Sequence, residues 1–172
     1  MSRDTTAGKV FEKKTRIAPL LLSVGYIEEN GVYTSPCGIL EVTLHSQGDI
    51  FKKKTGLLEK LEAPNRYDFS KQKNPDEGIL VKNLNDNSLK FYVVEKKFQK
   101  TNGSADEKLE TIHCKTEWFQ NLFDGTPVQV EYVYLLNEWF LQYKYNDVRK
   151  YFARHNYKVM YEEYDLELLG LI

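Results

Sequence analysis

Cysteine is scarce in this chain of 172 residues, which contains only Cys37 and Cys114. The two lie far apart and do not have the close spacing of zinc-binding motifs, so a structural zinc site is not expected. Two isolated cysteines also do not make the disulfide framework of a small secreted domain. We therefore expect reduced thiols in a cytoplasmic protein.

Long apolar runs are absent too, and a membrane-spanning helix needs roughly 20 apolar residues. The first ten residues, MSRDTTAGKV, lack the apolar core of a signal peptide. These two features predict a protein without a membrane partner.

Charge of one sign does not dominate, because 24 Lys and Arg residues face 25 Asp and Glu residues, for a formal net charge of −1. An anionic partner must therefore bind local clusters of basic residues, since the surface as a whole is not basic.

Hydrophobic residues make up 41% of the chain and aromatic residues 13%. A chain of this length and composition buries one substantial core, and seldom two. We expect a single domain over residues 1–172.

Apolar periodicity and turn-forming residues predict the order of elements along the chain. Residues 26–50 fit short strands or an irregular excursion, and Pro19 indicates a kink or boundary in the first helix. Ser104 and Glu107 form a capping box that opens the second helix. The fold class is α/β, with a mixed central sheet flanked by helices. The expected elements are a helix over 10–24, one or two helical turns over 55–62, a loop over 64–75, strands over 79–82 and 90–98, a helix over 104–123, a strand over 128–136, a helix over 145–157 and a strand over 158–164.

The segment NLNDNS joins the strands over 79–82 and 90–98, and its Asn and Asp side chains favour a hairpin turn. Antiparallel pairing then brings Asp76 toward Glu95. Side chains two residues apart in a strand point to the same side, so Glu95, Lys97 and Gln99 share a face. Two converging carboxylates suit Mg²⁺, and a neighbouring lysine suits phosphodiester hydrolysis.

At these residues the chain resembles the PD-(D/E)xK nuclease superfamily, and the type II restriction endonucleases in particular. The resemblance rests on Pro75-Asp76, followed after a gap by Glu95-Lys96-Lys97. It covers residues 74–123 well and the remainder by the order of elements. It implies a restriction-endonuclease-like core over about 74–136.

Carried onto this sequence, the resemblance implies that Asp76 and Glu95 bind Mg²⁺, for which Mn²⁺ is a substitute. The backbone carbonyl of Lys96 is a further metal ligand, and Lys97 is catalytic and acts on the attacking water. Three other residues are candidates for a catalytic or metal role. Glu77 is an alternative to Asp76 as the first acid, Glu12 has a solvated helix face as its ordinary alternative, and Gln99 has a plain strand-end amide.

Basic and polar residues near this motif are candidates for binding DNA. The N-terminus of the helix after Ser104 offers backbone N–H groups to an anion, and lysines contact phosphates. A merely solvated surface is the alternative for the triple lysine. The candidates are Lys52, Lys53, Lys54, Lys100, Asn102, Ser104 and Lys108.

The resemblance implies a Mg²⁺-dependent, site-specific endonuclease acting on double-stranded DNA. One domain carries one site, so cutting both strands requires a homodimer, sequential nicking or a partner nuclease subunit. A repair or recombination nuclease of the same superfamily and a non-catalytic DNA-binding module with this fold are the alternatives. For the segment EKKFQK the alternative is a solvated strand end, in which Lys and Glu protect an exposed edge from aggregation.

Overall fold

The computed structural model of the chain describes residues 5–46, 48–102 and 105–172. Within these residues, seven strands form one sheet in sequence order, from β1 to β7. Neighbouring strands from β1 to β5 pair antiparallel, whereas β6 runs parallel to both β5 and β7. The expected mixed sheet is confirmed. The strands are β1 (Ile27–Glu29), β2 (Val32–Thr34), β3 (Leu40–His45), β4 (Glu77–Asn83), β5 (Leu89–Lys97), β6 (Val128–Leu136) and β7 (Lys158–Tyr161).

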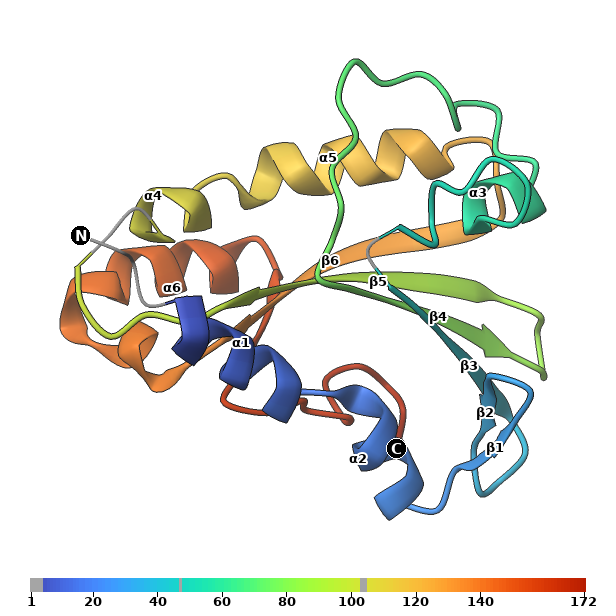
Figure 1. Cartoon of the computed structure of the whole chain (residues 1–172), viewed down its shortest axis with the longest axis horizontal. Coiled ribbons are helices and arrows are strands. Elements are labelled where there is room, and N and C mark those ends of the chain that lie inside the picture. Colours follow the sequence, from blue (N-terminus) through green and yellow to red (C-terminus); the bar gives the residue numbers. More distant parts are fainter. Residues whose placement is uncertain (1–4, 47, 103–104) are drawn as a thin grey trace.

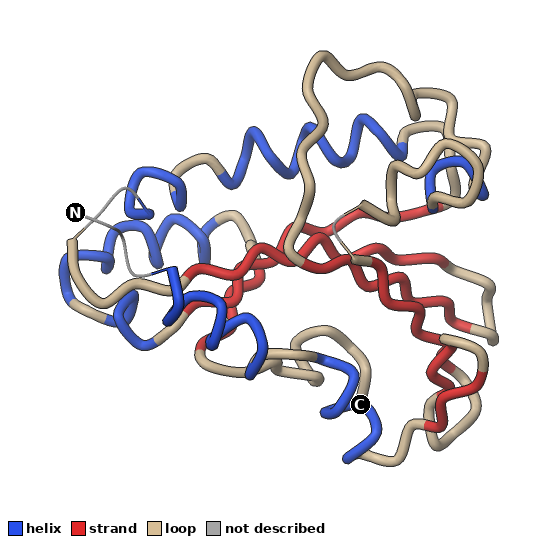
Figure 2. The backbone as a smooth tube through the Cα atoms, viewed as in Figure 1, coloured by secondary structure: helices blue, strands red, loops and turns tan. Residues whose placement is uncertain are grey.

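Helices lie on both sides of this sheet. Figure 1 shows α4 and α5 above the sheet and α1 and α2 below it, and Figure 2 shows the strands as the layer between them. The helices are α1 (Thr5–Lys14), α2 (Ile17–Ser23), α3 (Leu57–Lys60), α4 (Ala105–Leu109), α5 (Ile112–Phe123) and α6 (Asn146–Arg154), with short 3₁₀ helices η1 (Glu138–Leu141) and η2 (Tyr143–Tyr145).

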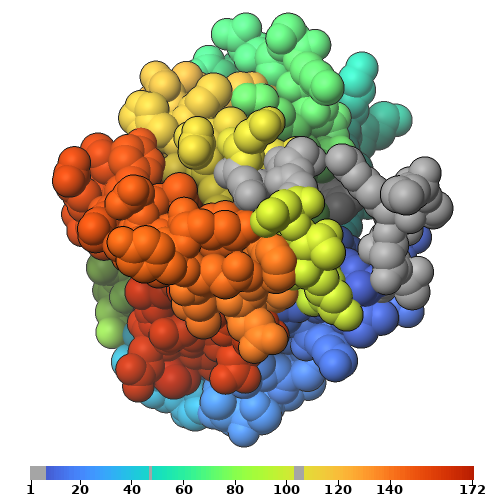
Figure 3. Space-filling model, turned by 90° about the vertical axis from the view of Figure 1, so that its left-hand side faces the viewer, coloured from blue at the N-terminus to red at the C-terminus, as the bar shows by residue number. Residues whose placement is uncertain are grey.

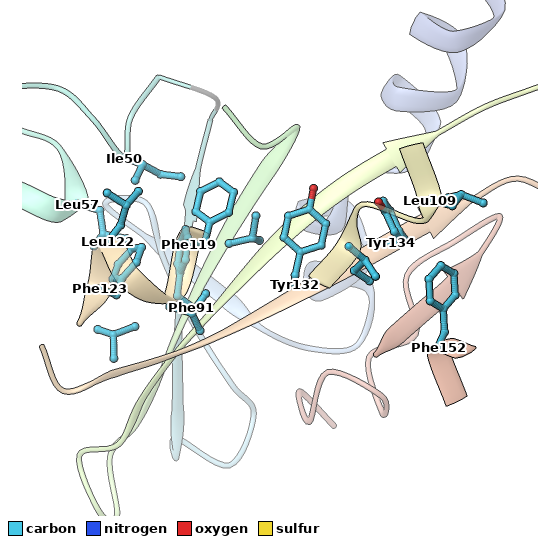
Figure 4. Packing of buried hydrophobic residues seen from close by; sticks show 14 of the residues in the cluster. Ile50, Leu57, Phe91, Leu109, Phe119, Leu122, Phe123, Tyr132, Tyr134 and Phe152 are labelled. Atoms are coloured by element: carbon cyan, nitrogen blue, oxygen red, sulfur yellow. The ribbon is translucent and has the colours of Figure 1, made fainter. Parts of the chain in front are cut away.

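The sheet separates two clusters of buried apolar side chains. Alternation along β5 sends Phe91 and Val93 into one cluster and Tyr92 and Val94 into the other. The first cluster packs against α5 and α6 and contains a row of aromatic rings, visible in Figure 4. The second packs against α1, α2 and the C-terminal segment. The central strands are thus buried on both faces, which explains their nearly continuous apolar sequence.

The helix expected over 10–24 is in fact two helices, and the break precedes Pro19. Arg16 has an extended backbone, with φ −102° and ψ 132°, and separates α1 from α2. The hydroxyl of Thr15 donates to the carbonyl of Phe11, which closes the end of α1. Pro19 is tolerated because it lies in the first turn of α2, where its missing N–H has no partner to lose.

The helix expected over 104–123 is also divided, into α4 and α5. The hydroxyl of Thr111 donates to the carbonyl of Lys108, 2.8 Å away, at the junction between the two. Side chains of this kind compete with the backbone for hydrogen bonds and favour helix ends. Ser104 of the expected capping box lies outside the described residues.

The remaining elements agree with the sequence pattern. β4 and β5 form the expected hairpin, β6 has the expected bounds, and α6 and β7 fall within the expected ranges. Across 26–50 the short-strand alternative is correct. Among the helices of the described residues, none combines the length and the apolar character that crossing a membrane requires.

His45, at the end of β3, gives folding stability a dependence on pH. Burial lowers the pKa of His45 below its ordinary value, with Lys60 adding to this effect and Asp49 opposing it. The unfolded chain therefore binds a proton at His45 more readily than the folded chain. The resulting stability is present above the ordinary pKa of about 6.5 and is lost as the pH falls below it.

We predict that replacing His45 with Leu reduces the loss of stability on acidification. The free energy of unfolding in urea is measured near pH 7.5 and near pH 5.5, and the difference is smaller in His45→Leu than in the parent. The same substitution at the exposed His155 is the control and leaves the difference unchanged. If the free energy of unfolding falls equally in the parent and in His45→Leu between the two pH values, His45 is not the source of the pH dependence.

Candidate active site

Pairing of β4 with β5 brings Asp76 to the end of β5. Glu77 is opposite Val94 in the antiparallel register, and the N–H of Asp76 donates to the carbonyl of Val94 at 3.1 Å. The carboxylate of Asp76 in turn accepts the backbone N–H of Lys96, with its Oδ2 at 2.7 Å. Asp76 is thus fixed beside the Glu95-Lys96-Lys97 segment by two backbone contacts.

Glu95 points toward the α5 side of the sheet and accepts from two lysines through one oxygen. Its Oε1 lies 2.5 Å from Nζ of Lys97 and 3.2 Å from Nζ of Lys115, which comes from α5. The side chains of Glu95 and Lys97 are only 16% and 18% exposed. This partial burial reduces the screening of their charges by water, so the cluster is held more firmly than a surface ion pair.

Tyr132, on β6, binds the other oxygen of the same carboxylate. Its hydroxyl donates to Oε2 of Glu95 at 3.0 Å, and the residue as a whole is 3% exposed. Burial and the negative charge of Glu95 raise the pKa of Tyr132, so the phenol stays protonated as a donor. Figure 4 shows the ring between Phe119 and Tyr134, whose centroids lie 6.1 and 5.6 Å away.

The pKa values of the two carboxyl groups of the site, Asp76 and Glu95, are shifted in opposite directions. Burial raises the pKa of Asp76, and the nearby charge of Glu95 raises it further against the opposing backbone N–H of Lys96. Burial also acts to raise the pKa of Glu95, but Lys97, Lys115 and Tyr132 together lower it. At Asp76 the effects of burial and of the Glu95 charge thus outweigh those of the Lys96 N–H and of Lys97.

Lys96 points to the opposite side of the sheet, as strand alternation requires. Its Nζ lies 2.9 Å from Oε2 of Glu77 and also donates to the carbonyl of Thr15 at the end of α1. The hydroxyl of Tyr164 donates to the same Glu77 oxygen at 2.6 Å. Glu77, a candidate acid in the sequence, is thus engaged on the face away from Glu95.

Glu12 and Gln99, the other candidates, lie on two different sides of the site. Glu12 is exposed on α1 and lines a pocket together with Asp76, whose pKa it helps to raise. Gln99 lies beyond the end of β5, where its backbone N–H and carbonyl bind the side-chain amide of Asn137 at 3.0 and 2.9 Å. Among the described residues, the buried side-chain amide of Gln99 has no hydrogen-bond partner.

The predicted DNA-binding residues fall into two groups in space. Lys52, Lys53 and Lys54 are exposed on the loop after β3, where Lys52 pairs with Asp49 and lowers its pKa to about 2. Lys100 and Asn102 follow β5, and Lys144 Nζ donates to Asn102 Oδ1 at 2.5 Å.

Lys100 and Asn102 belong to the segment 98–102, which Figure 3 shows beside the segment 137–150. Lys108 is exposed at the end of α4, whereas Ser104 lies outside the described residues. The described DNA-binding candidates therefore lie in separate segments: the loop after β3, the residues after β5 and the end of α4.

A metal would be held here by few side chains. The structure brings Asp76 and Glu95 to one end of the β4–β5 pair, and carboxylate oxygens suit Mg²⁺, which keeps several waters of its own. Across the described part of the chain, no group of three or more His, Cys, Asp or Glu side chains is placed to hold a metal ion. The metal site expected from the sequence therefore stays a prediction, with Asp76 and Glu95 as its two neighbouring carboxylates.

Comparisons with known proteins give no further guide to the site. No protein family model, no curated protein and no solved structure matches this chain. The case for the site therefore rests on its own residues.

Sequence reasoning missed Lys115 and Tyr132, both of which bind Glu95. Each lies in an element whose sequence already has a structural explanation, an amphipathic helix and an apolar strand. Tyr132 can be identified only from the parallel register of β5 and β6. In this register Tyr134 is opposite Glu95, and Tyr132 lies two residues earlier on the same face of β6. That register follows from the fold and has no local sequence motif.

We predict that Tyr132→Phe weakens divalent-cation binding by about 10- to 100-fold, the usual effect of removing a group that orients a metal ligand. The measurement is Mn²⁺ affinity from electron paramagnetic resonance of the free ion. Tyr134→Phe is the matched control, because the Tyr134 hydroxyl donates instead to the carbonyl of Lys108 at 2.8 Å. Equal affinities in the two variants would contradict a role for Tyr132 in orienting Glu95.

Proposed function

We propose that this chain is a Mg²⁺-dependent endonuclease of the restriction type, which hydrolyses phosphodiester bonds in double-stranded DNA. One observation carries the proposal. The Glu95–Lys97 pair lies at the end of β5, directly beside an Asp76 carboxylate that is bound to the Lys96 N–H. Two carboxylates and a lysine at one place are the groups that metal-assisted phosphodiester hydrolysis requires.

The arrangement of elements supports the same proposal. The motif residues lie on an antiparallel hairpin, the chain then forms helix α5, and it returns as β6 parallel to β5. α5 covers the face that carries Glu95 and supplies Lys115 to it. This order of helix, hairpin, helix and parallel strand is consistent with the restriction-endonuclease-like core implied by the resemblance over residues 74–136.

The proposed cation is Mg²⁺, with Mn²⁺ as a substitute, and its ligands are Asp76, Glu95 and the Lys96 carbonyl. Burial raises the pKa of Asp76 and the charge of Glu95 adds to this effect, and a cation beside both carboxylates would favour their charged forms, which supports this assignment. When bound, the cation lowers the pKa of water and neutralises charge that develops on the phosphate.

The protein groups around the cation have distinct roles in the proposed reaction. Lys97 orients the attacking water or stabilises negative charge on the phosphate, as an ammonium group held beside the reacting atoms does. Lys115 lies on the same Glu95 oxygen and supplies a second positive charge at that end of the site. Tyr132 keeps Glu95 in place while the lysines turn toward the substrate.

One chain carries one such set of residues, so each chain cuts one strand. Cleavage of a duplex then requires a homodimer, two sequential nicks or a partner nuclease subunit.

Digestion of a supercoiled plasmid with and without Mg²⁺ tests the proposal. Discrete fragments that depend on Mg²⁺ are the expected product of a site-specific endonuclease. Nicked circles alone would identify a chain that needs a partner subunit, and a smear would favour a repair or recombination nuclease. An intact plasmid at every Mg²⁺ and Mn²⁺ concentration would overturn the proposal in favour of a binding module.

We predict different defects for the two motif residues on β5. Lys97→Ala leaves both carboxylates in place, so DNA binding persists while single-turnover cleavage falls by about 10²- to 10⁴-fold. Glu95→Ala removes a proposed metal ligand, so raising Mn²⁺ restores part of the lost activity. The same increase in Mn²⁺ has a smaller effect on Lys97→Ala.

Lys150→Ala is the control for loss of a lysine, because Lys150 is an exposed residue of α6 that pairs with Asp147. It should cleave at the parental rate. Parental rates in both Lys97→Ala and Glu95→Ala would mean that this group of charged residues has no catalytic role.

A further inference from the structure

A pocket of about 640 Å³ opens beside Asp76 on the face of the sheet covered by α1. Its lining brings together residues from α1, the end of β3, the loop after β3 and the hairpin strands. The charged members are Lys9, Glu12, Lys13, Arg16, Asp49, Asp76, Glu77 and Lys96.

Some of these charges are already paired inside the protein. Lys96 pairs with Glu77 at 2.9 Å, and Asp49 pairs with Lys52. Lys9, Lys13 and Arg16 are exposed, and none forms an ion pair with another described residue. The three cations beside Asp76 are therefore available to an external anion.

The spacing of the three cations suits an extended ligand. Lys9 and Lys13 are one helical turn apart on α1, about 6 Å along its axis, so their side chains share a face. Arg16 continues this line at the extended junction between α1 and α2. A single small anion does not span such a row, whereas successive phosphates of a nucleic-acid strand do.

We propose that Lys9, Lys13 and Arg16 form a track for the sugar–phosphate backbone of DNA, leading to Asp76. This inference rests on the proposed nuclease function for its catalytic meaning, and it names the surface that holds the substrate. Contacts of this kind position the duplex without reading its sequence. The acidic Glu12 and Asp76 in the same pocket repel phosphate, so a divalent cation favours binding along the track.

The track differs from the basic residues that stand out in the sequence. Lys52 of the triple lysine is held by Asp49, and Lys100 lies over the ring of Phe98 in a different pocket, which it shares with Lys14. Lys13 and Lys14 are thus neighbours on one helix that line different pockets. They provide a matched pair of substitutions with the same change in net charge and in side-chain type.

The test measures duplex DNA affinity by fluorescence anisotropy over a series of KCl concentrations at constant Mg²⁺. All proteins carry Lys97→Ala so that the duplex stays intact. Lys13→Gln should flatten the slope of log affinity against log salt by about 0.9, the value for one lost phosphate contact. Lys14→Gln should leave the slope unchanged.

A triple variant, Lys9→Gln with Lys13→Gln and Arg16→Gln, should flatten the slope by about two to three units. The comparison is a triple Gln variant of Lys52, Lys53 and Lys54, with the same charge change. An equal or larger effect from that comparison variant, or equal slopes for Lys13→Gln and Lys14→Gln, would overturn the track. If a triple variant fails to fold, the comparison of the single variants Lys13→Gln and Lys14→Gln still tests the track.

The outcome separates this inference from the proposed function. Mg²⁺-dependent cleavage by the protein with Lys97 intact, together with an unchanged slope in Lys13→Gln, would refute the track alone. If Lys13→Gln flattens the salt dependence of DNA affinity, Lys14→Gln does not, and the protein with Lys97 intact never cuts DNA, the track is supported as a binding surface and the nuclease proposal is refuted.

Discussion

The antiparallel pairing of β4 with β5 is the constraint on which the candidate site depends. It places Asp76 at the end of β5, where the carboxylate accepts the backbone N–H of Lys96. Strand alternation then sends Glu95 and Lys97 to one face and Lys96 to the other. A one-residue shift in this register would reverse the faces and separate Asp76 from Glu95 and Lys97.

The two hydrophobic clusters keep that register in place. β5 and β6 bury apolar side chains on both faces, so neither strand can slide without exposing apolar surface on one side. At the strand end this packing admits a polar group, in which Tyr132, Lys115 and Lys97 surround Glu95. Partial burial then strengthens the charges of the site, because water screens them less than it would at the surface.

The sequence predicts much of the fold and part of the site. The turn residues of NLNDNS and the alternation after Lys90 locate the hairpin, and with it Asp76, Glu95 and Lys97. Pro19 predicts a boundary in the first helix, but its place at Arg16 and the break at Thr111 were not predicted, because side-chain hydrogen bonds and tertiary packing interrupt the apolar periodicity there. Lys115 and Tyr132 escaped because they meet Glu95 only through the parallel register of β6 and the packing of α5.

The central claim is that Asp76 and Glu95 hold one divalent cation, and its most direct test is crystallographic. Crystals soaked in Mn²⁺ are measured at a wavelength where Mn²⁺ scatters anomalously. The account predicts one strong anomalous peak per chain, about 2 Å from a carboxylate oxygen of Asp76 and from one of Glu95. A peak elsewhere on the chain, or no peak while Lys97 remains bound to Glu95, would contradict it.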